Sequence, residues 1–401
     1  MYKILQINCV YNYGSTGVIT KNIHEALIKS GLESVVLYGR KQNSKEKNVI
    51  KTCTEVEAKA WNVISRFTGS PYNVAPFGTR KLIKLLKHER PDLVHLQCIN
   101  GFFVNIYELL DYLKSNKIPT VVTLHAEFMY TGNCGHALEC DEWKRGCNRC
   151  ADVRRAIRSI WRKTTNRNWI DMKSAFDGFE KIQICAVSDW VKMRAEQSPI
   201  LNQYSIETVL NGIDTKTFFY NEKSAYEFRK NNGWGNRKVI LHVTANYKNP
   251  EKGGGFVTEL SKALDKNKYI IVVVDGNDNP TPDDFYGVYW GRAKNQKELV
   301  GLYSAADVTV ITSKRETFSM VCAESLCCGT PIIGFKAGAP EMISLPQYSK
   351  FVEYGNINAL KENIENAYFG EKKEIEETAK KKYSQGEMVS QYMKIYTDMC
   401  D

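Results

Sequence analysis

The stretch KILQINCVYNYGSTGVITKNIHEALIKSG, residues 3–31, sets out the pattern on which the fold depends. Residues 3–10 form a nearly continuous apolar run, which is typical of a strand covered on both faces. A glycine-containing turn follows, and then apolar residues recur at helical spacing through Ile19, Ile23 and Leu27. A buried strand, a turn and a helix in this order predict a parallel sheet covered by helices.

The same alternation continues along the chain and later restarts. Further buried strands are expected at 34–39, 93–97, 120–125 and 182–188, and a second series at 239–245, 269–276, 307–313 and 331–335. Helical segments separate them, so each series predicts one doubly wound, Rossmann-like α/β domain. Two such domains suit 401 residues better than one.

The two domains are expected to meet near residues 204–214, where VLNGID contains an Asn-Gly turn. This gives an N-terminal domain at 1–205 and a C-terminal domain at 206–383. A final helix, 384–401, is expected to pack back on the first domain. Ligands of such folds bind at the carboxyl ends of strands, here in a central cleft that the two domains face.

Composition narrows the class of protein. The chain is 43% hydrophobic and 25% charged, and no run of 18 apolar residues would span a membrane. The start lacks the apolar core and cleavage site of a signal peptide, so a cytoplasmic protein is expected. Twelve cysteines in that compartment should be reduced, buried or metal-bound.

The positive charge is concentrated in the N-terminal half. Residues 1–200 hold 30 Lys and Arg against 19 Asp and Glu, whereas residues 201–401 hold 25 against 26. Residues 144–167 hold nine cations and one acid, with Ile157, Ile160 and Trp161 on another face of the expected helix. The basic half suggests an anionic partner, which could be a phospholipid surface, a phosphorylated acceptor or nucleic acid. The helix pattern suits a peripheral contact with an inner-leaflet membrane surface, and equally a solvated helix packed through its apolar stripe. No motif indicates nucleic acid.

Two glutamates stand out in KRETFSMVCAESLCCGTP, residues 314–331. Glu316 follows an expected strand, and Glu324 lies within a short apolar helix that ends at Gly329. The start of such a helix favours phosphate, and the two acids could accept hydrogen bonds from a sugar and a ribose. Spacing alone leaves open that both are solvated surface residues.

The block LYSAADVTVITSKRETFSMVCAESLCCGTPIIGFKAGAPEMI, residues 302–343, resembles the donor site of the retaining glycosyltransferases of family 4, which use nucleotide sugars and have the GT-B fold. The resemblance covers essentially the whole chain and is closest to the branch that builds bacterial capsular and exopolysaccharide repeat units. It implies that Glu316 contacts the donor sugar and Glu324 the nucleotide ribose. Backbone amides at four further residues would hold sugar and phosphate: Phe318, Ser319, Met320 and Val321.

The loop NYKNPEKGGG, residues 246–255, follows the first strand of the second domain. In similar enzymes this loop carries an arginine and then a Lys-Gly that hold the donor diphosphate. Lys252 matches the lysine, whereas the arginine position falls on Asn246. Lys248 or Arg315 could supply the missing charge, and a merely solvated loop is the alternative for Lys248.

Two residues of the first domain are candidates for the same cleft. Gly17 lies in the turn Gly14-Ser-Thr-Gly17, which the resemblance places against the donor diphosphate and the acceptor. His125 ends an expected strand, and the resemblance places it near the donor sugar; a structural histidine is equally common. The family pattern is often His-Asp, whereas here Ala126 follows and the acid is Glu127, whose role is doubtful.

Four cysteines are spaced C-x5-C-x6-C-x2-C in a polar segment: Cys134, Cys140, Cys147 and Cys150. Four thiolates can complete a structural zinc site, and reduced cysteines in a loop are the alternative.

The sequence therefore predicts a hexosyltransferase that uses a UDP- or GDP-linked sugar and needs no catalytic metal. Glu316, Lys252 and His125 are the expected catalytic residues, and the acceptor implied by the resemblance is a glycan or an undecaprenyl-diphosphate-linked sugar. A sugar-nucleotide epimerase of the same fold and a non-catalytic binding subunit are the alternatives. The identity of the sugar, the linkage and the oligomeric state do not follow from the sequence.

Overall fold

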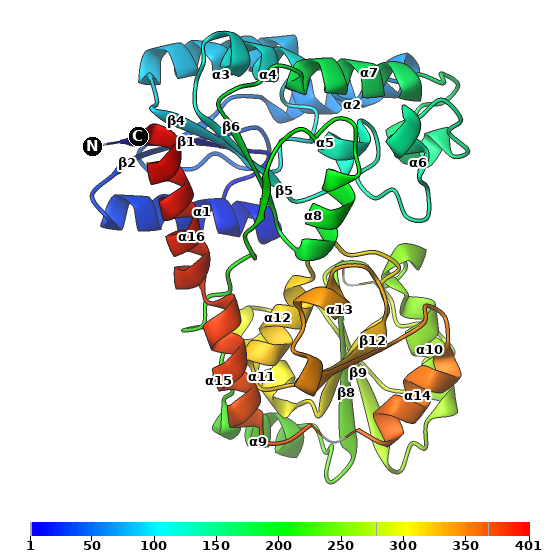
Figure 1. Ribbon diagram of the computed structural model, residues 1–401. Helices are drawn as coiled ribbons and strands as arrows, with labels where there is room; N and C mark the ends of the chain where they lie inside the picture. The colour runs from blue at the N-terminus through cyan, green and yellow to red at the C-terminus, as the bar shows by residue number, and fades with distance from the viewer. Residues whose placement is uncertain (1, 278, 368) are drawn as a thin grey trace. The chain divides into compact units, whose positions relative to one another are not determined.

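A computed structural model describes residues 2–277, 279–367 and 369–401 of the chain (Figure 1). The chain divides into two compact units. The first comprises Met1–Leu210 together with Val389–Asp401, and the second comprises Asn211–Met388. None of the helices described is long and apolar enough to cross a bilayer.

The first unit is built on a parallel sheet. Its described strands lie in the order β3-β2-β1-β4-β5-β6-β7. Their bounds are β1 Lys3–Asn8, β2 Glu33–Tyr38, β3 Val49–Lys51, β4 Leu93–Leu96, β5 Thr120–Leu124, β6 Ile182–Ala186 and β7 Ile206–Thr208. Each strand pairs in parallel with its neighbour, as connections through helices require.

The helices of this unit begin with α1 Gly14–Lys29, α2 Glu55–Thr68, α3 Pro76–Glu89 and α4 Ile106–Ser115. After β5 come α5 Phe128–Thr131, a 3-10 turn Glu142–Arg145, α6 Val153–Ile157, α7 Thr165–Phe176 and α8 Asp189–Glu196. Polar side chains start several of them: Thr54 accepts a hydrogen bond from the Glu57 amide, and Asn105 accepts one from the Glu108 amide.

The second unit repeats the architecture with the strand order β10-β9-β8-β11-β12-β13. The strands are β8 Lys238–Thr244, β9 Tyr269–Asp275, β10 Val288–Gly291, β11 Val308–Ile311, β12 Ile332–Phe335 and β13 Ser349–Val352. The helices are α9 Glu222–Asn231, α10 Gly254–Ala263, α11 Gln296–Ala305, α12 Met320–Cys327, α13 Pro340–Ile343, α14 Ile357–Glu365 and α15 Lys372–Tyr383, with 3-10 turns at Pro250–Lys252 and Pro346–Tyr348. The last helix, α16 Gln385–Cys400, starts in this unit and belongs to the first unit from Val389 onward.

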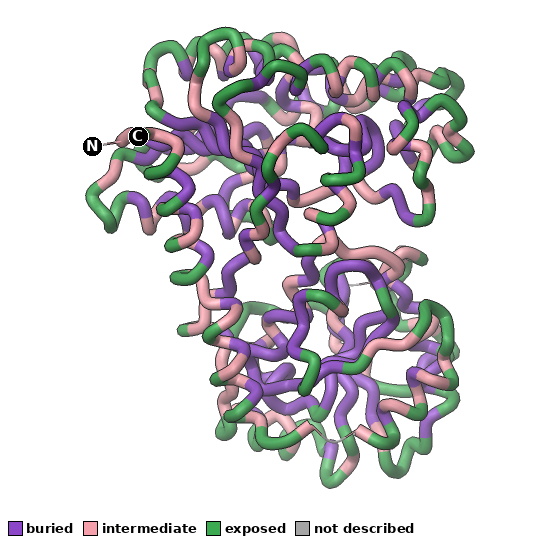
Figure 2. Tube along the Cα trace, viewed as in Figure 1, coloured by how far each residue is buried: buried purple, intermediate pink, exposed green. Residues whose placement is uncertain are grey.

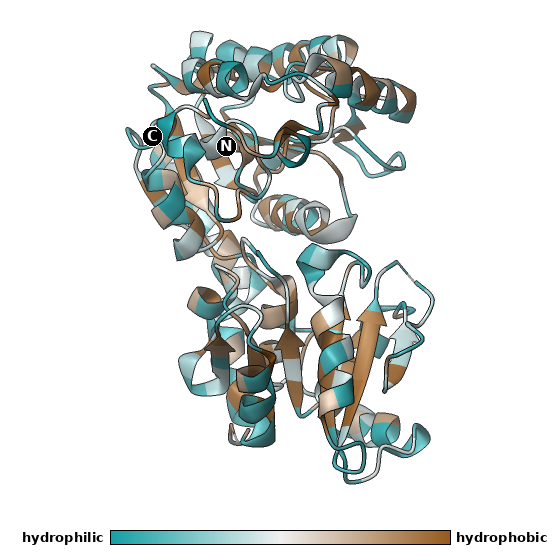
Figure 3. Cartoon of the chain, turned by 90° about the vertical axis from the view of Figure 1, so that its right-hand side faces the viewer, coloured by the Kyte–Doolittle hydropathy of each residue, from teal (hydrophilic) through white to brown (hydrophobic). Residues whose placement is uncertain are grey.

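Each unit has its apolar core around its own sheet. The central strands are buried along nearly their whole length (Figure 2), whereas the edge strands β3, β7 and β10 and the short β13 are only partly buried. The central strands of the second unit are predominantly hydrophobic in Figure 3. In the second unit Val257 and Leu260 of α10 pack with Ile271 and Val273 of β9 in one cluster. Continuous apolar strands covered by helices on both faces bury the area that stabilises such a unit.

The end of helix α16 packs on the first sheet through buried hydrogen bonds. The His95 Nδ1 atom lies 2.6 Å from the Tyr396 hydroxyl, and His95 Nε2 lies 2.7 Å from Thr123 Oγ1. Thr123 in turn contacts the Tyr392 hydroxyl at 2.8 Å. Burial holds the pKa of His95 well below its usual value, so the imidazole is neutral in this network.

The expected strands and the terminal helix are confirmed to within a few residues, and α/β with two parallel sheets is the observed fold. Short strands β3, β7, β10 and β13 were not predicted. The expected continuous basic helix over 144–167 is wrong. Helix α6 ends at Ile157 because Arg158 adopts a left-handed backbone conformation, and the next helix, α7, begins only at Thr165.

Replacing Tyr396 with Phe should lower the free energy of unfolding of the first unit by about 1 kcal/mol, because the buried His95 Nδ1 atom would lose its shorter hydrogen bond and keep only the 3.2 Å contact with the Gln97 amide. Thermal denaturation followed by circular dichroism measures the effect. Thr397→Ala is the matched control, since that hydroxyl is exposed and bonds only within its helix. Equal melting temperatures for the Tyr396→Phe protein and the wild type would show that the network does not stabilise the fold.

Candidate active site

The topology of the second sheet marks one position for a ligand. Strands β8 and β11 are neighbours, and the chain leaves them in opposite directions, toward β9 on one side and β12 on the other. The loops that follow β8 and β11 therefore diverge at this point, which is where open α/β sheets bind ligands. Lys252 lies on the first of these loops and Glu316 on the second.

The loop after β8 lies tightly against the end of β11. The Lys314 amide donates to the Glu251 carbonyl at 2.8 Å, and the Thr312 hydroxyl donates to the Lys252 carbonyl at 3.2 Å. Gly253 has φ +74°, and a Cβ added there would lie 2.1 Å from the Thr312 carbonyl oxygen. Only glycine allows this approach, which fixes the position of Lys252.

Glu316 is held by the loop that follows β12. Its amide donates to the Ala337 carbonyl at 2.9 Å, and its own carbonyl accepts from the Ala339 amide at 3.2 Å. The Glu341 carboxylate accepts hydrogen bonds from the amides of Ala337 and Gly338 and so fixes that loop. Glu341 lies in the block 302–343 that resembles the family's donor site, but the sequence did not indicate this role for it.

The two loops bring an ammonium and a carboxylate into contact. The Lys252 Nζ atom lies 2.7 Å from Glu316 Oε1, and both side chains are partly exposed, at 29% and 20%. A charge-assisted bond of this length orders both groups. The exposure of both side chains leaves them accessible to a ligand.

Helix α12 begins directly after this pair. Ser319 precedes it with φ +78°, an uncommon conformation for a residue with a side chain, and its hydroxyl accepts weakly from the Cys322 amide at 3.4 Å. Phe318 is buried, whereas Met320 and Val321 are half-buried. The predicted amide-bearing residues therefore surround the start of the helix, where the partial positive charge favours an anion.

Glu324 lies within α12 and is poorly solvated. Burial raises the pKa of its carboxyl to about 7, and a hydrogen bond from the Tyr303 hydroxyl, 3.2 Å from Oε2, lowers it in part. Tyr303 of α11 was not identified from the sequence, because nothing in its local pattern distinguishes it from a core aromatic. The carboxyl is thus close to half-protonated at neutral pH.

The two supplementary cations differ in position. Lys248 is exposed, and its amide donates to the Asn246 side chain at 3.1 Å. Asn246, at the position where similar enzymes carry arginine, also accepts from Asn279 at 3.1 Å and so shapes the loop. Arg315 is half-buried on the segment that leads to Glu316.

The candidates of the first unit lie at the carboxyl edge of its own sheet. The His125 Nε2 atom lies 2.7 Å from the Gln97 side-chain oxygen, and burial lowers the pKa of His125 to about 4, so its ring is neutral. Gly17 is buried in α1, and its carbonyl accepts from the Asn12 amide at 3.0 Å. A Cβ at Gly17 would lie 3.1 Å from Val10, so packing alone favours glycine there.

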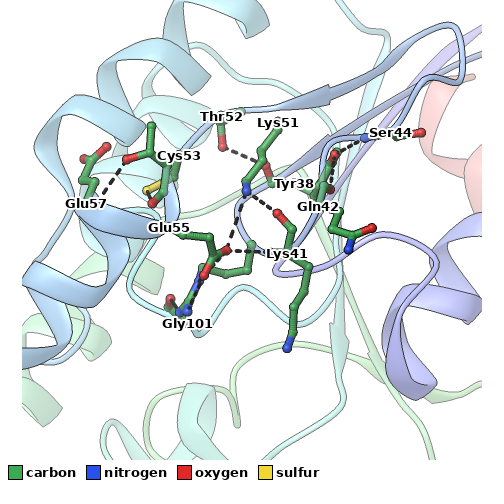
Figure 4. A network of polar contacts seen from close by, with 12 residues as sticks. Tyr38, Lys41, Gln42, Ser44, Lys51, Thr52, Cys53, Glu55, Glu57 and Gly101 are labelled. Atoms are coloured by element: carbon green, nitrogen blue, oxygen red, sulfur yellow. Dashed lines mark hydrogen bonds and ion pairs between the residues drawn. The ribbon is translucent and has the colours of Figure 1, made fainter.

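A polar network that the sequence did not reveal fixes the same edge of this sheet (Figure 4). Arg40, just after β2, donates to both carboxylate oxygens of Glu55 and to the Gly101 carbonyl at 3.0 Å. The Lys41 amide donates to Glu55 at 2.5 Å. These contacts lower the pKa of Glu55 to about 2 and join the loops after β2 and β4. The acid partner lies on α2, too far along the chain for a local pattern to indicate it.

Glu127 has a structural role. It is fully buried and forms an ion pair with Arg194, whose Nη2 atom lies 2.9 Å from Oε2. Its other oxygen accepts from the Ala137 amide at 3.2 Å, which anchors the cysteine-containing segment.

The four cysteines of that segment do not meet as ligands of one ion. In the part of the chain that the structure describes, no three His, Cys, Asp or Glu side chains form a group that could hold a metal. The zinc site therefore stays a prediction.

Comparisons with known proteins identify the family and the fold of the chain. The family model described as Glycosyltransferase Family 4 matches residues 16–217, half of the chain, and that described as Glycosyl transferases group 1 matches residues 227–384. An uncharacterized 41.2 kDa protein in the cps region of Klebsiella pneumoniae is 24% identical over 387 residues, covering 92% of this chain and 97% of that protein. The putative colanic acid biosynthesis glycosyl transferase WcaC of Escherichia coli is 26% identical over 161 residues, 37% of this chain and 39% of WcaC.

Solved structures share the fold. Sucrose-phosphate synthase from Thermosynechococcus elongatus aligns over 100% of this chain and 99% of its own, with a TM-score of 0.71 and 13% identity. Anabaena HepE in complex with UDP aligns over 99% of this chain and 100% of its own, with a TM-score of 0.68 and 13% identity.

The two parallel α/β sheets and the solved structures that align with them show the GT-B fold, and the family matches identify a glycosyltransferase. The chain belongs to Glycosyltransferase Family 4.

Replacing Gly253 with Ala should weaken nucleotide binding by about tenfold and lower the melting temperature, because the new Cβ would collide with the Thr312 carbonyl and displace Lys252. Isothermal titration with UDP and a thermal melt measure the two effects. Gly255→Ala is the matched control, since a Cβ there meets nothing within 4 Å and favours the helix. Equal UDP affinity in the two variants would contradict the role given to this close approach.

Proposed function

We propose that the enzyme transfers a sugar from a nucleotide-diphosphate sugar, with retention of configuration, to a glycan or lipid-linked acceptor during synthesis of a cell-surface polysaccharide. The observation that carries the proposal is the contact between Lys252 and Glu316 across the switch point of the second sheet. It joins a cation for the diphosphate and an acid for the sugar at the position where this fold binds ligands.

The donor would bind along the first turns of α12, with its diphosphate at the start of the helix and its ribose near Glu324. The amides around Ser319 and the ammonium of Lys252 are proposed to bind the diphosphate, and Arg315 and Lys248 are proposed to add positive charge. Glu324, one turn into α12, would accept hydrogen bonds from the ribose hydroxyls. Glu316 would be released from Lys252 in part and contact the sugar.

In the proposed reaction the bond between the anomeric carbon and the diphosphate oxygen breaks, and a bond to the acceptor oxygen forms on the same face of the sugar. The acceptor proton passes to the departing phosphate oxygen, so no separate base is needed. Lys252 and the amides of α12 stabilise the negative charge that develops on the diphosphate, and Glu316 stabilises the positive charge on the sugar. His125 is proposed to contact the donor sugar as a neutral hydrogen-bonding group.

The acceptor class rests on the relatives. The Klebsiella protein is named for a cps region and WcaC for colanic acid biosynthesis, both of which concern surface polysaccharides. UDP is the first nucleotide to test because HepE has been solved with UDP and with UDP-glucose. A GDP-linked donor is the second candidate to test.

Glu316→Gln should lower kcat by about a hundredfold to a thousandfold, since the charge at the sugar is lost while the shape is kept. Donors are first screened by thermal shift across nucleotide sugars, and transfer to a lipid-linked acceptor is then followed by mass spectrometry. Glu259→Gln, an exposed position on α10, is the matched control and should retain wild-type turnover. A wild-type rate in Glu316→Gln would refute the proposed site.

The affinity for a UDP-linked donor should rise with pH, by up to roughly tenfold between about pH 6 and about pH 8, because Glu324 becomes a carboxylate as the pH passes its pKa of about 7. Isothermal titration at each pH measures this rise. Glu324→Gln should abolish it, and the difference between the two proteins cancels any titration of the nucleotide itself.

The same carboxyl should affect stability in the opposite direction. Its pKa is higher in the folded than in the unfolded protein, so the folded state loses stability as the pH rises from about 4.5 to about 7. Without ligand, Glu324→Gln should therefore melt at a higher temperature than the wild type at pH 8 and at a similar one at pH 4.5. Parallel melting curves at all pH values would show that Glu324 is an ordinary solvated acid.

A further inference from the structure

Helix α2 exposes several large apolar side chains, while its Trp61 is half-buried. Val56, Val63 and Phe67 are 79%, 53% and 44% exposed, whereas the residues it buries are the small Ala58 and Ser65. With Ala60 the outward residues recur at helical spacing along one face. A surface helix normally places its large apolar residues in the core, so this stripe indicates a partner.

The segment after α6 extends this face. The Ile160 amide donates to the Arg66 carbonyl at 3.0 Å, and the Thr164 hydroxyl donates to the Gly69 carbonyl at 2.6 Å, which fixes the segment on the end of α2. Ile160 and Trp161 are 48% and 64% exposed. The Trp161 ring packs edge-on against Phe67, with centroids 5.5 Å apart. The apolar surface is therefore ordered before any partner arrives.

A cationic pocket lies beside these aromatic residues. It has a volume of about 350 Å3 and is lined by Arg66, Arg154 and Arg158 with Ser159 and Ile160. All three arginines are exposed, and among residues 2–277, 279–367 and 369–401 none of them forms an ion pair. The acids Glu55 and Glu57 of α2 face away from it, toward Arg40 and the Gly78 amide.

We propose that this docking face, formed by Val56, Val63, Phe67, Ile160 and Trp161 with the three-arginine pocket, binds the surface of a bilayer that contains anionic phospholipid. The aromatic and aliphatic side chains would enter the interface between headgroups and acyl chains. The pocket would take a headgroup phosphate, which guanidinium groups bind through two parallel hydrogen bonds. The inference does not depend on the proposed sugar transfer.

A bilayer suits both features of this face. Nucleic acid would account for the arginines but gives no place for Val56 and Val63, and a second copy of the chain would account for the apolar stripe but would bring two sets of unpaired arginines together. A surface that is apolar beneath a negatively charged layer complements both the stripe and the arginines.

The test uses the full chain without donor or acceptor. Vesicles of phosphatidylcholine with phosphatidylglycerol are compared with vesicles of phosphatidylcholine alone in a co-sedimentation assay. Binding is expected to the anionic vesicles, and to weaken in high salt because screening reduces the arginine contribution. Brominated lipids should quench the emission of Trp161, which a Trp161→Phe variant identifies among the seven tryptophans.

Two sets of variants separate the two features. Phe67→Ser with Trp161→Ser should weaken vesicle binding about tenfold and remove the quenching. Arg154→Gln with Arg158→Gln should weaken binding to the anionic vesicles by a similar factor and leave that to phosphatidylcholine unchanged. The matched controls are Ile28→Ser and Lys29→Gln with Lys84→Gln, which alter exposed apolar and cationic side chains elsewhere in the same unit.

Four outcomes would overturn the inference. The first two are no vesicle binding by the wild type and an equal loss of binding in the control variants. The third is concentration-dependent self-association in ultracentrifugation that Phe67→Ser removes, which would assign the face to a second copy. The fourth is salt-sensitive binding of a nucleic acid duplex in place of vesicles. Thermal melts followed by circular dichroism show whether a variant that loses vesicle binding is still folded. Turnover on a soluble acceptor is measured separately and tests only the proposed function.

Discussion

The contact between Lys252 and Glu316 depends on the backbone more than on the two side chains. It forms because the loop after β8 can lie against the end of β11, and that requires a residue without Cβ at Gly253. On the other side Glu341 holds the amides of Ala337 and Gly338, so Glu316 is fixed by a loop from a third strand. Elements from three strands thus converge on one ion pair, and displacement of any of them would separate it.

The two glutamates of the site differ in environment, and this difference suits different tasks. Glu316 is paired with an ammonium and is partly exposed, so it can approach a developing positive charge. Glu324 is poorly solvated, and its pKa near 7 makes the carboxylate costly without a ligand. Ribose hydroxyls would supply the hydrogen bonds that the apo site lacks. Part of the donor's binding free energy would then come from relieving an unfavourable charge.

The sequence predicts a feature when the residues that determine it are close together along the chain. Continuous apolar strands and the short helix closed by Gly329 depend on neighbouring residues, and these predictions were confirmed. The short strands at sheet edges and the Arg40–Glu55 network depend on segments that meet only in three dimensions, so no local pattern indicated them. The continuous basic helix is a case in which the local pattern predicted an element that does not form. Its charged and apolar residues are present, but the left-handed backbone conformation of Arg158 ends the helix, and the chain then runs along α2.

The turn at Arg158 gathers several cations of the first unit at one place, although no continuous basic helix forms. The cations of residues 154–158 and Arg66 of α2 come from separate elements, and the hydrogen bond from Ile160 to Arg66 brings them together around one pocket. The same bond places Trp161 beside Phe67. A helix would have distributed the arginines along its length and directed Trp161 to one side. The folded-back segment instead concentrates three positive charges and an aromatic pair at the end of α2. This arrangement suits a bilayer, in which anionic headgroups lie over hydrocarbon chains.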